Sequence, residues 1–178
     1  MRLPYVPNPP QTTTPEDAEI VSRVQARRAP GPLQSIDLTL LHAPAVASGW
    51  NAFFGSVRDQ STLPADIREV SILRVAVLCK SKFELNEHTP YAMRAGVSDT
   101  GIKAVMEGTR EGLTDAQWAA VQYAEHMTRD VKVPREVFDG LRAFVSDRQM
   151  VEVTATVGAL NCATRFLAAL DVGEYNED

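Results

Sequence analysis

The segment from residue 64 to residue 80 constrains the fold of this chain more than any other feature. It opens on Ser61-Thr62-Leu63-Pro64, and from Ile67 to Leu78 apolar residues occupy nearly every side of the helix that their spacing predicts. A helix that is apolar all round is stable only when other elements bury it. We therefore expect a buried helix over residues 64–80, and we expect part of it to be buried in an oligomer, because it is too apolar for the surface of a small monomer.

Further helices are predicted from their start and stop signals. The clearest start is Thr14, which is followed by a proline and two acids, and that helix should end before residues 29–32. The last long segment, from Met150, is rich in β-branched residues and could be a strand, but Ser146 and Gln149 form a capping-box pattern that favours a helix. No repeat and no hairpin signal is found, so the predicted fold class is all-α. The other predicted helices are two pieces within residues 38–57 interrupted at Pro44, one over residues 82–95 that stops at Gly96, and three that start at Ser98, Thr114 and Pro134.

The length of 178 residues suits one folded domain. We expect residues 1–14, which are rich in proline, to form an extended arm and residues 15–178 to form a single helical domain. The two cysteines, Cys79 and Cys162, belong to no C-x-x-C pair, so neither a zinc site nor a redox dithiol is expected. Cys79 lies in the apolar segment, where a cysteine is usually an inert small hydrophobe and not a nucleophile.

The net charge limits the partners of the chain. Eighteen Lys and Arg against 23 Asp and Glu give a formal charge of −5, so there is no positive excess for binding nucleic acid or an anionic membrane. The first residues lack the apolar stretch of a signal peptide, and no segment is expected to reach the roughly 20 apolar residues of a membrane span. We therefore expect a cytoplasmic protein with no nucleic-acid partner and no membrane partner.

One carboxylate stands out within the apolar segment. Glu69 is followed at helical spacing by Ile72, Leu73, Ala76 and Val77. Burial without a partner would raise the pKa of Glu69 and make it a neutral proton carrier. Alternatively, Glu69 lies at the rim of the helix and complements the helix dipole. Its position alone favours neither interpretation.

A second set of polar residues shares one face of the next predicted helix. Ser81, Glu84, His88 and Tyr91 are spaced by three, four and three residues. A Glu–His pair four residues apart can hold the imidazole and make it a general acid near neutral pH. The alternative is an ordinary solvated helix face, which is the commoner case for this spacing. A metal site is a weaker interpretation, since Glu84 and His88 supply only two ligands.

Two residues of the last helix could also enter a pocket. Asn161 lies on an apolar stripe, and Arg165 follows it by four residues. Alternatively, Asn161 bonds to a nearby backbone group and Arg165 pairs with a surface acid. The glycine-rich motifs of nucleotide-binding proteins, the G-x-S-x-G motif of serine hydrolases and the H-E-x-x-H motif of metalloproteases are absent from the sequence.

Residues 63–76 (LPADIREVSILRVA), followed by residues 83–88 (FELNEH) and 95–98 (AGVS), resemble the carboxymuconolactone decarboxylase family. This family shares its fold with alkyl hydroperoxide reductase D, a thiol peroxidase. The resemblance covers about residues 40–110 well and the region of Asn161 and Arg165 more loosely. It implies an all-helical bundle that assembles as a trimer or a hexamer, with sites near subunit contacts.

The resemblance also implies roles for single residues. Glu69 matches the acid at the start of the core helix, and His88 matches the histidine that handles protons. In the peroxidase branch two thiols occupy the positions of Ser81 and Glu84, and their absence here disfavours a dithiol peroxidase, which must cycle through a disulfide. Leu85 stands where many decarboxylase-like relatives have tryptophan, which changes the shape of the pocket.

The expected function is that of a decarboxylase on a small carboxylated lactone or keto-acid-like substrate, working without metal, flavin or nucleotide. His88 would donate the proton, Glu84 would orient His88, and Glu69 would relay protons or bind substrate as a neutral acid. Substrate would contact Tyr91 and Asn161, and Arg74 or Arg165 would anchor a carboxylate. Two alternatives are an isomerase or hydrolase without thiols, and a helical binding or assembly protein that has no activity. In the binding protein, Glu69, Glu84 and His88 need not converge.

Overall fold

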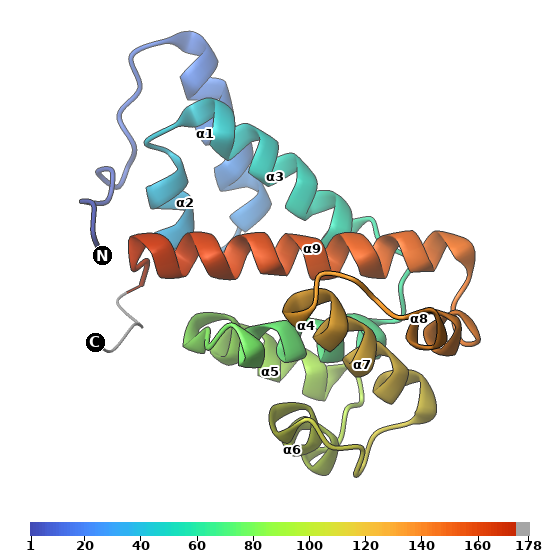
Figure 1. Ribbon diagram of the computed structural model, residues 1–178. Coiled ribbons are helices and arrows are strands. Elements are labelled where there is room, and N and C mark those ends of the chain that lie inside the picture. Colours follow the sequence, from blue (N-terminus) through green and yellow to red (C-terminus); the bar gives the residue numbers. More distant parts are fainter. Residues whose placement is uncertain (174–178) are drawn as a thin grey trace. The chain divides into compact units, whose positions relative to one another are not determined.

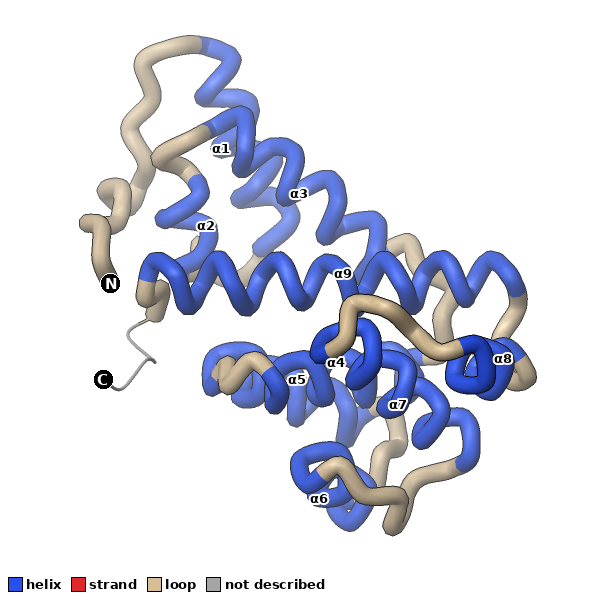
Figure 2. Tube along the Cα trace, in the orientation of Figure 1, coloured by secondary structure: helices blue, strands red, loops and turns tan. Residues whose placement is uncertain are grey.

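The computed structural model describes residues 1–173, and every regular element among them is an α-helix (Figures 1 and 2). The predicted all-α fold class is confirmed. The described part of the chain forms two compact units, one made of residues 1–60 and 166–173, the other of residues 61–165. The single domain expected over residues 15–178 stays a prediction.

The first unit is built from α1 (Pro15–Arg28), α2 (Ser35–Leu40) and α3 (Pro44–Asp59), which contacts both of the others. Helix α1 begins as predicted, because the side chain of Thr14 accepts a hydrogen bond from the amide of Asp17. Its last residue is Arg28, directly before the proline-rich turn. The core of the unit includes Val24, Ala47, Phe54 and Val57.

Residues 1–14 contain no helix, and they contact their own unit at several points. The Arg2 amide donates to the carbonyl of Leu170 at 2.8 Å, and its guanidinium donates to the carbonyl of Ala169 at 3.1 Å. These two carbonyls belong to the last turn of a helix and have no partner within it. The Val6 amide donates to the Leu38 carbonyl at 3.3 Å. The first six residues of the expected arm are therefore held to their own unit by hydrogen bonds.

The second unit is centred on α4 (Ala65–Leu78), which contacts α5 (Lys82–Arg94), α6 (Asp99–Glu107) and α7 (Asp115–Arg129). The side chains of Val70, Ile72 and Leu73 are fully buried. The prediction of a buried helix is confirmed, but the helices of its own unit bury it. The apolarity of α4 therefore gives no reason to expect an oligomer. The short helix α8 (Arg135–Arg142) contacts α7.

A three-residue turn joins α4 to α5 and positions the two helices for a shared site. Lys80 has a left-handed backbone (φ 55°), and the amide of Ser81 donates to the carbonyl of Ala76 at 2.9 Å. This pattern satisfies the last carbonyls of α4 and reverses the chain. Ser81 then caps α5, because its hydroxyl accepts from the amide of Glu84. The reversal lets side chains of α4 and α5 meet.

The last segment forms one helix, α9 (Asp147–Leu170), as the capping pattern at Ser146 predicts. By length and composition alone α9 could cross a membrane, which the sequence analysis did not anticipate. However, 44% of its most apolar stretch is buried inside the protein. Its Thr154 hydroxyl lies 2.8 Å from the Tyr123 hydroxyl, and its Asn161 donates to Thr128 at 2.9 Å. Burial and polar contacts of this kind are those of a core helix.

Candidate active site

Three ionisable side chains of the second unit meet between α4 and α5. His88 Nδ1 lies 2.8 Å from Oε2 of Glu69, and His88 Nε2 lies 3.4 Å from Oε2 of Glu84. The three residues are 3%, 2% and 7% exposed, respectively. The imidazole therefore lies between two carboxylates, one near each ring nitrogen, in a buried part of the second unit.

Glu69 carries its charge in this setting. Burial by itself raises the pKa of Glu69. The hydrogen bond and charge of His88 and the contact with Arg68 lower this pKa by more than burial raises it, so the pKa of Glu69 lies below the ordinary value. Arg68 Nε donates to Glu69 Oε1 at 3.0 Å. The neutral form of Glu69, one of the interpretations that its position left open, is therefore not favoured, because His88 and Arg68 are partners that the sequence pattern did not reveal.

The charge of Glu69 also fixes the proton on His88. An ionised carboxylate only accepts hydrogen bonds, so Nδ1 is the nitrogen that donates to Glu69. Nε2 then faces Glu84 over the longer contact. The orienting contact thus comes from Glu69 on the neighbouring helix, whereas the sequence predicts it from Glu84, four residues before His88.

Tyr91 lies at the solvent side of this cluster. Its ring centroid is 5.7 Å from that of His88, and the residue is 42% exposed. The guanidinium of Arg94, on the next turn of α5, lies 4.5 Å from the centre of the Tyr91 ring. The sequence analysis missed Arg94, although it follows Tyr91 by three residues and continues the polar face of α5.

The other predicted substrate-binding residues are engaged elsewhere in the second unit. Arg74 is 4% exposed, donates to Glu125 at 2.6 Å and to the carbonyl of Val105 at 2.9 Å, and so links α4 to α7 and α6. Arg165 bonds to the side chain and carbonyl of Asn161 and lies 3.7 Å from the sulfur of Cys79. Their contact with substrate stays a prediction. Cys79 itself is half-buried at the C-terminal cap of α4, not inside the helix.

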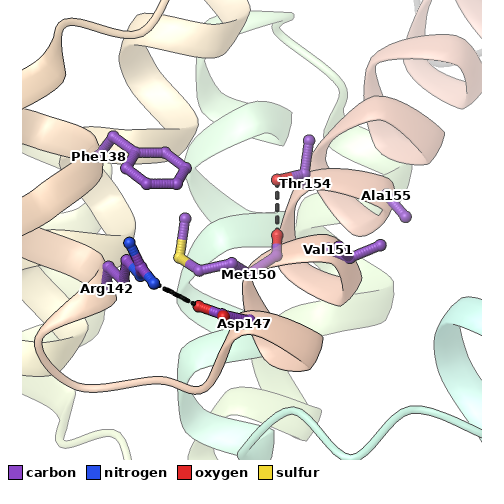
Figure 3. Close-up of a pocket in the computed structure, with 7 residues that line it drawn as sticks. All are labelled: Phe138, Arg142, Asp147, Met150, Val151, Thr154 and Ala155. Atoms are coloured by element: carbon purple, nitrogen blue, oxygen red, sulfur yellow. Dashed lines mark hydrogen bonds and ion pairs between the residues drawn. The ribbon is translucent and has the colours of Figure 1, made fainter.

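A pocket of about 600 Å³ lies elsewhere in the same unit, between α8 and α9 (Figure 3). Phe138 and Met150 face its interior, and Arg142 pairs with Asp147 at 2.9 Å. The Thr154 hydroxyl donates to the carbonyl of Met150 at 2.6 Å. This pocket shares no lining residue with the cluster around His88.

The other histidines take no part in the cluster. His126 lies 2.8 Å from its neighbour Asp130 on the surface of the second unit, and His42 of the first unit lies 2.6 Å from the carbonyl of Pro4. Among residues 1–173, no three His, Cys, Asp or Glu side chains are arranged to hold a metal ion.

Solved structures with the same fold support this architecture. The alkylhydroperoxidase AhpD core of a peroxidase-related protein from Ralstonia eutropha JMP134 matches with a TM-score of 0.75 and 16% identity, over 99% of this chain and 92% of that one. The debrominase Bmp8, as a cysteine-to-alanine variant bound to 2,3,4-tribromopyrrole, matches with a TM-score of 0.71 and 18% identity, over 89% and 84% of the two chains. A protein of unknown function from Agrobacterium tumefaciens matches with a TM-score of 0.66 and 19% identity, over 79% and 97%. No curated protein matches the sequence.

The family comparison agrees with the resemblance noted in the sequence. Residues 44–129 match the carboxymuconolactone decarboxylase family, and this range includes α3 to α7 and therefore Glu69, Glu84 and His88. Over this range the chain is similar to the carboxymuconolactone decarboxylase family.

Proposed function

We propose that this protein is an enzyme that moves a proton to or from a small carboxylated substrate, with His88 as the general acid and base. The observation that carries the proposal is the buried contact of His88 with Glu69 and Glu84. A binding protein does not require such convergence, because a buried ionisable cluster costs desolvation energy without improving packing. The cluster therefore favours an enzyme over an assembly protein.

The reaction that suits this cluster best is decarboxylation of a lactone acid or a β-keto acid. The bond between the carboxyl carbon and the neighbouring carbon breaks, CO₂ leaves, and the electron pair forms an enolate. His88 then gives a proton from Nε2 to that carbon, while Glu69 on Nδ1 stabilises the positive charge of the ring before the transfer. Glu84, beside Nε2, returns a proton from solvent to the ring.

Ser81 and Glu84 stand where the peroxidase branch has its two thiols, and each has a different role in this chain. Ser81 caps α5 with its hydroxyl, and Glu84 contacts His88 with its carboxylate. Neither side chain can form the disulfide that a dithiol peroxidase needs. We therefore propose acid–base chemistry and not peroxide reduction, in contrast to the AhpD-type proteins that share the fold.

The proposal is tested with a panel of carboxylated lactones and β-keto acids. The purified protein is incubated with each compound, CO₂ release is recorded, and the product is identified by mass spectrometry. We expect at least one compound to lose CO₂ faster than in buffer. A product of unchanged mass would instead indicate an isomerase, and one heavier by a water molecule a hydrolase. If the whole panel is left unchanged, the proposed function is wrong.

A further inference from the structure

We infer that Arg94 is the anion-binding residue of the site and that it receives the carboxylate of the substrate next to Tyr91. This inference rests on the proposed function, because it concerns the substrate class of the same site. It adds Arg94, which the sequence pattern did not single out and which lies six residues after His88 on α5. Arg94 is offered here in place of Arg74 or Arg165 as the anchor for the carboxylate.

The first step of the argument is that the other arginines around α4 and α5 are already engaged. The charge of Arg74 is balanced by Glu125 and that of Arg68 by Glu69. Arg165 bonds to Asn161 and lies beside Cys79. A carboxylate that approached any of these three would have to compete with an existing partner.

The second step is that the charge of Arg94 is not balanced by a carboxylate among the described residues. Its side chain is exposed, and within the described part of the chain no carboxylate forms an ion pair with it. Its guanidinium lies 4.5 Å from the centre of the Tyr91 ring, and this contact orders the group without neutralising it. A planar guanidinium held in one place is suited to binding a carboxylate through two parallel hydrogen bonds.

The third step is the path from Arg94 to the reacting group. Arg94, Tyr91 and His88 follow one another at three-residue spacing on α5, so they lie near one another along the helix. Exposure falls along this series from the exposed Arg94 through the half-exposed Tyr91 to the buried His88. A substrate whose carboxylate is bound by Arg94 would therefore place its other end beside Tyr91, towards His88.

The test measures binding, not turnover, so it does not depend on the reaction being identified. The probe is 5-oxotetrahydrofuran-2-carboxylate, a carboxylated lactone, and its methyl ester is the uncharged control. Both are titrated into isotopically labelled protein, and the NMR signals of the Arg94 side chain and the His88 ring are followed. We expect the carboxylate to shift both signals and the ester to shift neither.

Variants then separate the binding role from a structural one. Arg94→Gln should weaken binding of the carboxylate at least tenfold, because a hydrogen bond to a charged group is lost. Arg94→Lys keeps the charge but not the planar group, so its affinity for the carboxylate should lie between those of the wild type and Arg94→Gln. Arg135→Gln is the matched control, since Arg135 is exposed and paired with Asp139, and it should bind like the wild type.

Three results would overturn the inference. These are a wild-type protein that does not respond to the carboxylate, an ester that binds as tightly as the acid, and an Arg94→Gln variant with unchanged affinity. If Arg94 only complements the dipole at the end of α5, Arg94→Gln lowers the melting temperature and leaves the affinity unchanged. Binding that depends on Arg94 in a protein that turns over no compound of the panel would leave this inference standing and contradict the proposed function alone.

Discussion

Glu69 is a buried carboxylate whose charge is stabilised by two neighbours. His88 and Arg68 together outweigh the desolvation of the group, and the pKa of Glu69 is lowered as a result. A group with a lowered pKa stabilises the folded protein when it is ionised. The charge needed to orient His88 therefore also contributes to stability.

Replacing Glu69 by glutamine tests this contribution. The variant keeps the shape of the side chain but loses the charge, and we expect its free energy of unfolding near pH 6 to fall by about 1–3 kcal/mol. The difference from wild type should be fully present above the ordinary glutamate pKa of 4.5 and should disappear as the pH falls through the lowered pKa of Glu69. Urea unfolding at a series of pH values measures it.

The matched control for that experiment is Glu107→Gln. Glu107 forms an exposed ion pair with Lys103 at 3.8 Å, four residues earlier in α6. Exposed pairs of this kind contribute less than about 1 kcal/mol, so this variant should unfold like the wild type. A loss of stability at Glu69 that does not change with pH would show that packing, and not charge, is responsible.

At the residue scale, the sequence predicts the contact within one helix but not the contact between two helices. Spacing on one helix places Glu84 and His88 together, and the structure confirms that they are in contact. The contact of His88 with Glu69 joins two helices and depends on the turn at Lys80, which helical periodicity does not describe. Arg94 continues the polar face of α5, but this spacing does not single it out, because an exposed arginine near a helix end is common.

At the element scale, Arg74 holds the end of α6 in place. Its guanidinium donates to the carbonyl of Val105, one of the last carbonyls of α6, which have no partners within the helix. Gly108 ends α6 with a left-handed backbone (φ 74°), and a Cβ added there would lie 2.5 Å from Nη2 of Arg74. The glycine is required both by the backbone and by the close approach of Arg74.

We therefore expect Gly108→Ala to destabilise the protein by at least about 1–2 kcal/mol, from the left-handed conformation alone. Displacement of Arg74 adds to this loss. Gly140→Ala is the matched control, because Gly140 lies within α8 and a Cβ there would meet nothing within 4 Å. Alanine in that helix should be neutral or stabilising by up to about 1 kcal/mol. Thermal unfolding of the two variants compares them, and equal melting temperatures would contradict the role given to Gly108.

The helices themselves are well predicted by their local signals. Thr114 and Gln117 form the expected capping box at the start of α7, and Ser98 caps α6 through the amide of Gly101. Such signals act within one turn, so they can be found without knowing the fold. The prediction that α4 needs an oligomer for its burial fails because α5, α6 and α7 of the same unit cover it. Contacts between helices are not visible in the periodicity of one helix.

At the scale of the whole molecule, the family resemblance still predicts a trimer or a hexamer. Exposed apolar side chains that a partner could cover include Met93 at 52% and Val151 at 70%. Light scattering at micromolar concentration should give three or six times the protomer mass of 19.5 kDa. A mass of one protomer would show that the chain works as a monomer, and the site would then have to be complete within one copy.

The central claim, that His88 moves the proton in the reaction, is tested most directly by comparing two histidine variants. His88→Gln removes the buried imidazole, and His126→Gln removes a partly exposed imidazole in the last turn of α7, where it is paired with Asp130. The rate is measured on a compound of the panel that the wild type converts, and it is expressed per folded protein from circular dichroism. We expect His88→Gln to be about 10²–10⁴-fold slower and His126→Gln to match the wild type. A His88→Gln variant that converts the compound at the wild-type rate would contradict the claim.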